Sequence, residues 1–231
     1  MSDTNSQPWA AVDEYFSKLF IQPDQALSDA LTSSTKAGLP EINVAPNQGK
    51  LLQLLVSMCN AKRVLEVGTL GGYSTIWMAR ALPPDGVLIT LELDQKHADV
   101  ARANFRNAGV DNVVTLRQGA ARDTMQQLIN ENVAPFDLIF IDADKMNIPH
   151  YFAMSLALSR VGSIIIVDNV VRKGEVINEH TTDANVIGVR QFNELAAAER
   201  RVSATALQTV GVKGYDGLVI MQVTNPARPP R

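Results

Sequence analysis

From Arg63 to Asn169 the chain alternates short, almost continuously apolar runs with amphipathic segments of helical period. The apolar runs are RVLEVG, GVLITLEL, NVVTLRQG, FDLIFIDA and GSIIIVDN. Strands without polar alternation are buried on both faces, which is typical of parallel sheets covered by helices. The pattern therefore predicts an α/β fold with a doubly wound, mostly parallel sheet.

Two further apolar runs close the sheet near the C-terminus. SATALQTV and GLVIMQV are separated only by GVKGYD, and so short a connection permits only an antiparallel hairpin. A helix is expected before them, over residues 184–200. The sheet should therefore hold seven strands, five parallel ones followed by the antiparallel hairpin.

Extra helices are expected ahead of the sheet. Residues 9–20 and 24–38 repeat apolar side chains every three to four positions, and residues 49–60 do the same after a linker, 39–48, that holds two prolines. We interpret residues 1–231 as one domain. Residues 1–48 would cover the site, 49–224 would form the core, and 225–231 would be a frayed tail.

Composition excludes several classes of protein. The net charge is −3, with no extended cluster of Lys and Arg, which argues against a nucleic-acid surface. No apolar run approaches the roughly 18 residues that a membrane span needs. Cys59 is the only cysteine, so no intrachain disulfide can form. A cytoplasmic protein is expected.

Acidic residues follow nearly every predicted parallel strand. Ligands of open parallel sheets bind beyond the carboxyl ends of the strands. Carboxylates stand at four of these five ends, at Glu66, Glu92, Asp142 and Asp168. Loop acids would reach one or two ends by chance, so the set predicts a functional edge of the sheet.

The turn after the first strand indicates the cofactor. Its order is Glu66-x-Gly68-x-x-Gly71-Gly72, which lacks the first glycine of the dinucleotide fingerprint G-x-G-x-x-G. Glu66 would also repel a pyrophosphate. S-adenosylmethionine, which has a sulfonium and an ammonium group, suits the turn better. Gly68 and Gly72 would allow close approach, and Ser74 would meet the ligand's carboxylate.

Glu92 is the candidate ribose ligand. It lies about 20 residues beyond the glycine turn, where doubly wound folds place an acid on the ribose hydroxyls. The alternative is that Glu92 caps the next helix. Asp94 is the better cap, which would leave Glu92 free.

Asp142, Asp168 and Asn169 form a candidate metal site at the ends of the fourth and fifth strands. Two carboxylates and an amide oxygen suit a hard cation, with Mg²⁺ expected and Mn²⁺ or Ca²⁺ as alternatives. The alternative reading of Asp168-Asn169 is the start of a turn. Lys145 would be the general base, since a nearby cation disfavours an ammonium. Its alternative is a surface lysine paired with Asp144.

Four segments together, LEVGTLGGYS, LELD, FIDADK and VDN, resemble the cation-dependent O-methyltransferases of the caffeoyl-CoA and catechol type, in their bacterial branch. The resemblance runs from about residue 38 to the C-terminus. It implies transfer of a methyl group from S-adenosylmethionine to a hydroxyl of a catechol-like or hydroxycinnamoyl molecule, with Asp142 and Lys145 as catalytic residues, and a homodimer.

The resemblance also implies a set of cofactor contacts. The amino-acid part would meet Glu66, Gly68, Thr69 and Ser74, and the ribose would meet Glu92. Val44 would cover the cofactor, Ala121 would lie beside the adenine, and Asp142 would touch both cofactor and metal.

Two departures from the family bear on the acceptor. Arg172 stands where the plant caffeoyl-CoA enzymes have an aromatic residue, and no acid in GVKGYDG matches the glutamate of the catechol enzymes. The acceptor walls are expected from variable loops such as 170–183. An NAD-dependent oxidoreductase, a non-catalytic S-adenosylmethionine-binding protein and a metal-independent methyltransferase remain as alternatives.

Overall fold

The computed structural model describes residues 6–225, and the expected tail lies almost entirely outside them. Its seven strands form one sheet: β1 (Arg63–Val67), β2 (Val87–Glu92), β3 (Val114–Gln118), β4 (Phe136–Ile141), β5 (Ser159–Asp168), β6 (Val202–Gly211) and β7 (Gly214–Val223). The α-helices are α1 (Ser6–Phe20), α2 (Gln25–Lys36), α3 (Pro46–Met58), α4 (Tyr73–Ala79), α5 (Gln95–Asn107), α6 (Ala121–Asn130), α7 (Ile148–Ala157) and α8 (Ala184–Ala198). Short 3₁₀ helices are η1 (Lys145–Asn147) and η2 (Arg172–Ile177).

The sheet confirms the predicted plan. Its strand order is β3-β2-β1-β4-β5-β7-β6. Strands β1 to β5 run parallel, and β7 pairs antiparallel with both β5 and β6. The hairpin is tighter than expected, because β6 and β7 pair up to Gly211 and Gly214 and leave a two-residue turn. The order reverses beside β1 and β4, where doubly wound sheets bind ligands.

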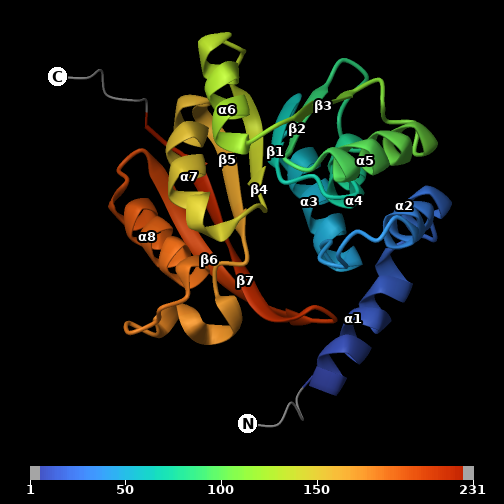
Figure 1. The fold of residues 1–231 in the computed structure, drawn as a ribbon, viewed down its shortest axis with the longest axis horizontal. Coiled ribbons are helices and arrows are strands. Elements are labelled where there is room, and N and C mark those ends of the chain that lie inside the picture. The colour runs from blue at the N-terminus through green and yellow to red at the C-terminus, as the bar shows by residue number, and fades with distance from the viewer. Residues whose placement is uncertain (1–5, 226–231) are drawn as a thin grey trace.

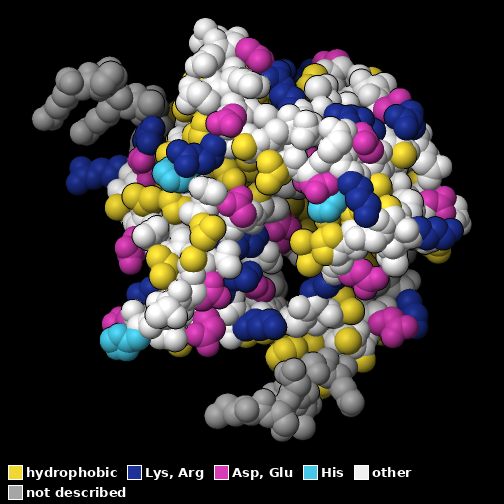
Figure 2. Space-filling view, viewed as in Figure 1, with side chains coloured by type: hydrophobic (Ala, Val, Ile, Leu, Met, Phe, Trp, Pro, Cys, Tyr) yellow, Lys and Arg dark blue, Asp and Glu magenta, His cyan; other side chains and the backbone are white. Residues whose placement is uncertain are grey.

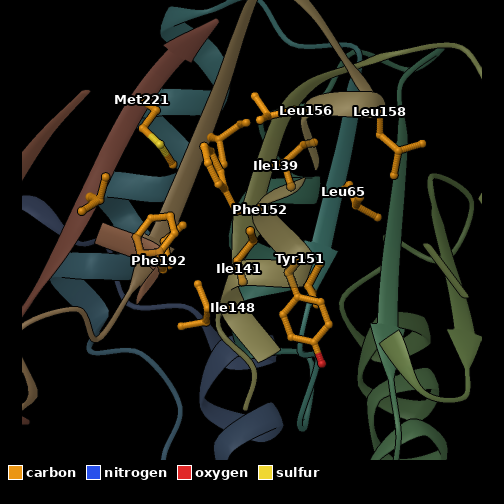
Figure 3. Packing of buried hydrophobic residues seen from close by; sticks show 14 of the residues in the cluster. Leu65, Ile139, Ile141, Ile148, Tyr151, Phe152, Leu156, Leu158, Phe192 and Met221 are labelled. Carbon is orange, nitrogen blue, oxygen red and sulfur yellow. The ribbon is translucent and has the colours of Figure 1, made fainter. Parts of the chain in front are cut away.

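Helices cover both faces of the sheet (Figure 1). One face packs apolar side chains of β1, β4 and β5 against α6, α7 and α8, and Figure 3 shows Phe152 and Phe192 inside this layer. Those two rings meet edge to face with centroids 5.4 Å apart. The other face packs against α3, α4 and α5, with α2 at its border. Because neighbouring residues of each strand serve opposite layers, the strands carry continuous apolar runs.

Helix α3 begins earlier than the sequence predicted. Residues 46–48 were expected to be extended linker, but Pro46 is at the first turn of the helix. Proline is tolerated there because its fixed φ suits a helix and its missing N–H is not needed. The earlier start of α3 places Gln48 on a helix that faces the site. In the same way, the polar loop after Asn169 holds η2.

Helix α1 is fastened to the opposite end of the chain through Asp13. The Asp13 carboxylate accepts hydrogen bonds from the backbone N–H of Val212, in the β6–β7 turn, at 2.8 Å and from the Asn47 amide at 3.0 Å. Asn47 is the second residue of α3. One carboxylate therefore joins the first helix, the closing hairpin and the helix before the sheet. None of the helices within residues 6–225 is long and apolar enough to cross a membrane.

Candidate active site

A cavity of about 620 Å³ lies beyond the carboxyl ends of β1, β2, β4 and β5. Figure 2 shows the molecule hollowed near the middle of this view, with acidic and basic side chains bordering the hollow. The predicted site residues that line the cavity are Val44, Gly68, Thr69, Ser74, Glu92, Ala121, Asp142, Lys145 and Asn169. Glu66 and Asp168 are buried and do not line the cavity, so they lie behind this wall.

The glycine turn is built around close approaches within the protein. Gly68 has φ of +101°, and a Cβ there would lie 2.0 Å from the backbone oxygen of Asp142. Gly72 has φ of +83°, and a Cβ there would strike the ring of Phe105 at 2.4 Å. Gly72 was expected to admit a ligand, but it makes room for a core side chain instead. Gly68 lines the cavity and brings the ends of β1 and β4 together.

Glu66 is held inside the protein by three hydroxyl groups. Ser74 donates to its carboxylate at 2.6 Å and Thr90 at 2.7 Å, and Thr75 donates as well. Burial raises the pKa of Glu66 to about 7, and the three hydroxyl donors only partly oppose this effect. Ser74 lies between Glu66 and the cavity, so Glu66 can affect a ligand in the cavity only by orienting the Ser74 hydroxyl.

Glu92 also has more partners than the sequence predicted. Asp94 caps α5 as expected, by accepting from Lys96 and His97 backbone N–H groups. The expectation that Glu92 is thereby left free is wrong. Its carboxylate accepts from the backbone N–H groups of Thr69 at 3.2 Å and Leu70 at 2.7 Å, and from that of Asp94 at 3.0 Å. Peptide groups of the glycine turn need acceptors, and Glu92 supplies them from the next strand.

The carboxylates after β4 and β5 lie next to each other, as the strand order requires. Burial, and then the negative charge of Asp142, raise the pKa of Asp168 to about 7. Asp168 accepts from the Gln48 amide at 2.5 Å and from the backbone N–H of Asn169 at 2.8 Å. Asn169 lines the cavity with φ of +59°, a conformation that asparagine tolerates better than most residues.

Lys145 pairs with Asp142 and not with Asp144. Its Nζ is 2.8 Å from Asp142 Oδ1, and the residue is only 9% exposed. Asp144 instead accepts a hydrogen bond from the Tyr151 hydroxyl at 2.6 Å and one from Asn147. The alternative of a surface lysine beside Asp144 is therefore wrong. The ammonium group lies at the wall of the cavity, next to the partly exposed Asp142 and close to the buried Asp168.

The donor set fits a hard divalent cation. Two carboxylates and an amide oxygen are the ligands such ions prefer, and a cation would offset the repulsion that raises the pKa of Asp168. Within residues 6–225 no three His, Cys, Asp or Glu side chains are grouped to hold a metal ion. A cation would therefore need Asn169 and oxygens from water or from a bound molecule.

Sequence reasoning missed several residues that shape the site. Gln48 was assigned to an extended linker, although its place after a proline at a helix start could have marked it. Tyr151, on α7, donates a hydrogen bond to Asp144. This bond depends on the turn made by η1, which no local sequence pattern predicts. His97, with Nδ1 at 3.6 Å from Glu92, also lines the cavity.

Comparison with known proteins gives a consistent result. A family model described as O-methyltransferase matches residues 21–222. The catechol O-methyltransferase of Niastella koreensis is 52% identical over 216 residues, which cover 94% of this chain and 98% of that protein.

Solved structures agree with these sequence matches. An O-methyltransferase from Bacillus cereus, determined in complex with SAH, superposes with a TM-score of 0.93 at 54% identity, over 94% of this chain and 99% of that one. TomG of Streptomyces achromogenes, an O-methyltransferase of tomaymycin synthesis determined with SAM, gives a TM-score of 0.93 at 46% identity, over 96% and 100% of the two chains.

Proposed function

Because the chain belongs to the O-methyltransferase family, it is an S-adenosylmethionine-dependent methyltransferase, and we propose that it methylates a hydroxyl of catechol-like or hydroxycinnamoyl molecules with the help of a divalent cation. One observation carries the proposal. Asp142, Asn169 and the Lys145 ammonium group line the same cavity as the glycine turn, with Asp168 directly behind them. A protein that only bound S-adenosylmethionine would have no use for this second group.

The glycine turn is the proposed seat of the cofactor. Gly68, Thr69 and Ser74 would meet the amino-acid part, Glu92 the ribose, Ala121 the adenine, and Val44 would cover the ligand. Glu66 would act through the Ser74 hydroxyl, to which it is bonded at 2.6 Å. The backbone N–H groups of Thr69 and Leu70 on Glu92 hold the turn in one shape, so little ordering would be required when the ligand binds.

The acidic end of the cavity is the proposed seat of the chemistry. When bound, S-adenosylmethionine supplies a methyl group on a sulfonium, and a divalent cation lowers the pKa of an acceptor hydroxyl. Asp142, Asp168 and Asn169 would hold the cation, which is expected to be Mg²⁺. As a neutral amine, Lys145 would accept the proton of the acceptor hydroxyl, and Asp142 would hold the ammonium that results. Holding both reactants in line contributes ~7–11 kcal/mol to such reactions.

Metal removal and one substitution test this proposal. Treatment with EDTA should abolish methylation of a catechol, and Mg²⁺ should restore it. Asp168→Ala should lower kcat at least a hundredfold, because the cation loses a carboxylate. The affinity for S-adenosylmethionine, measured by calorimetry, should stay near that of the wild type, since Asp168 does not line the cavity.

Other outcomes would favour the alternatives. Full activity of a chelator-treated, metal-free preparation would identify a metal-independent methyltransferase. Binding of NADH in place of S-adenosylmethionine would favour an oxidoreductase, although the glycine turn lacks the first glycine of the dinucleotide fingerprint.

A homodimer in the cytoplasm is the proposed form of the enzyme. Helix α1 exposes a row of large apolar side chains that includes Tyr15, Leu19 and Phe20. Apolar patches of this kind on a folded protein mark association surfaces. A second copy of the chain is the partner we propose for this face.

A further inference from the structure

Arg172 reaches the active-site cavity from the loop that follows β5. It lies three residues beyond Asn169, at the start of η2, and its side chain lines the same cavity. Residues 172–174 all have positive φ, at +54°, +56° and +91°, so the backbone turns sharply here. The turn brings the arginine back over the end of the sheet, close in sequence to the proposed cation ligand.

The Arg172 guanidinium lacks the hydrogen bonds that such a group normally makes. Its Nε atom is buried and has no hydrogen-bond partner in the part of the chain that the structure describes. The nearest carboxylate oxygen, Asp216 Oδ2, is 3.7 Å from a terminal nitrogen, which is too far for a hydrogen bond. A buried N–H without an acceptor is unfavourable, and the rest of the side chain, 29% exposed, is open to an acceptor from the cavity.

Asp216 is an ion-pair partner of the guanidinium, with Oδ2 3.7 Å from a terminal nitrogen, but it gives its hydrogen bonds to the loop backbone. Its Oδ1 accepts from the backbone N–H groups of Val171, Arg172 and Gly217, each at 3.0 Å. These bonds fix the start of η2 against β7. They also orient the carboxylate so that the guanidinium is beside it but not bonded to it. The loop therefore holds the Arg172 backbone in place, while the guanidinium makes no hydrogen bond to any residue within 6–225.

The other cations of the cavity are placed differently. Lys145 is bonded to Asp142 at 2.8 Å. His97 and Arg122 lie beside Glu92 and Ala121, at the end proposed for the cofactor. Only Arg172 combines a position next to Asn169 with an unused planar set of donors. Such a set matches the two oxygens of a carboxylate.

We propose that Arg172 binds a carboxylate on the acceptor, so that the preferred acceptors are catechols bearing an acid group, of the dihydroxybenzoate or dihydroxycinnamate class. This inference rests on the proposed function, since it takes the acceptor's two hydroxyls to face the acidic end of the cavity. An acid group elsewhere on the ring would then meet the loop wall. Neutral catechols would gain nothing from Arg172, and aminoalkyl catechols would be repelled by it.

Steady-state kinetics with matched acceptors test the proposal. The acceptors are 3,4-dihydroxybenzoate, its methyl ester and 3,4-dihydroxybenzylamine. The ratio of kcat/KM for the acid to that for the ester should fall about tenfold or more in Arg172→Gln, mainly through KM for the acid. The ester should change less than about threefold. Because the acid-to-ester ratio is compared between wild type and variant, differences in the intrinsic reactivity of the two rings cancel.

Two further variants control for charge and folding. Lys173→Gln removes the same charge from the adjacent exposed residue, which does not line the cavity, and should keep the wild-type ratio. Arg172→Lys should retain part of the preference for the acid, because the charge stays but the planar set of donors is lost. An unchanged ratio in Arg172→Gln, an equal loss for acid and ester, or the same loss in Lys173→Gln would each overturn the proposal.

A binding measurement separates this proposal from the proposed function. Calorimetry would follow 3,4-dihydroxybenzoate binding to wild type and to Arg172→Gln in the presence of Mg²⁺ and S-adenosylhomocysteine. Suppose that the wild type methylates no catechol but binds the acid, and that Arg172→Gln does not bind it. The proposed function then fails and the anion site stands. Equal binding to the two proteins, with catechol methylation intact, would refute the anion site alone.

Discussion

Glu66 gives the clearest prediction at the scale of the single residue. Burial raises its pKa from about 4.5 to about 7, so the folded protein holds a proton that the unfolded chain releases between these values. The stability from Glu66 is therefore complete below about pH 4.5 and is lost as pH rises through about 7. We expect Glu66→Gln to lack this loss, which amounts to roughly 2 kcal/mol between pH 5 and pH 8.

Denaturant unfolding of both proteins at several pH values measures this effect. The difference between their free energies of unfolding removes the contribution of Asp168, whose pKa is raised in the same range. Glu194→Gln, at an exposed position of α8, serves as the control and should follow the wild-type curve. Parallel curves for wild type and Glu66→Gln would show that the buried carboxyl titrates normally.

The residues also show where reasoning from sequence succeeds and fails. The topology alone grouped Asp142, Asp168 and Asn169, because neighbouring parallel strands bring their ends together. It could not foresee that Glu92 would be occupied by three backbone N–H groups, or that Glu66 would be covered by three hydroxyls. Those contacts depend on Ser74, Thr75 and Thr90, which are brought to Glu66 only by the packed sheet.

At the scale of the element, the contact between α8 and η1 controls the position of Lys145. Gly188 of α8 is buried, and a Cβ there would lie 2.4 Å from the backbone oxygen of Lys145. Alanine normally favours a helix over glycine by about 1 kcal/mol. We expect Gly188→Ala instead to destabilise the protein by about 1–3 kcal/mol and to lower kcat, since η1 must move.

Thermal unfolding and cofactor titration check this prediction. The affinity for S-adenosylmethionine should change little, because the glycine turn lies between β1 and α4, away from α8. Glu194→Ala, on the exposed side of the same helix, should leave both stability and kcat near wild type. An increase in stability with unchanged kcat would mean that η1 adapts without cost.

Element boundaries were the least predictable part of the fold. All seven strands were located, because continuous apolar runs mark them directly, but β5 and β7 begin at Ser159 and Gly214, three residues earlier than predicted. The start of α3 was misplaced because the two prolines favoured an extended linker, whereas Pro46 opens the helix. For that reason Gln48, which donates a hydrogen bond to Asp168, was not predicted as a site residue. Local preferences at a proline do not distinguish the end of a linker from the first turn of a helix.

At the scale of the whole molecule, the apolar face of α1 predicts the oligomeric state. Tyr15, Leu19 and Phe20 are 60%, 53% and 65% exposed in the single chain. If a second copy covers them, Phe20→Glu should convert the dimer into a monomer, because a carboxylate would be buried without a partner. Light scattering after size-exclusion chromatography measures the mass.

Lys18→Ala is the matched control on the same helix. Lys18 pairs only with exposed Glu14 in the described part of the chain, and such pairs contribute little to stability or association. It should leave the mass unchanged. A monomeric wild type, or a dimer that tolerates Phe20→Glu, would contradict this role for α1. The sequence pattern that predicted the fold does not predict the oligomeric state, because an apolar helix face shows only that something covers it.

The link from Asp13 to Val212 has a consequence for how the protein is made. The two residues are 199 positions apart, so the ribosome releases the first helix long before the hairpin that receives it exists. Helix α1 is thus synthesised well before the β6–β7 turn with which Asp13 completes its contacts. This contact does not cover the apolar row of Tyr15, Leu19 and Phe20, which stays more than half exposed in the folded single chain, so assembly and not folding would have to bury it.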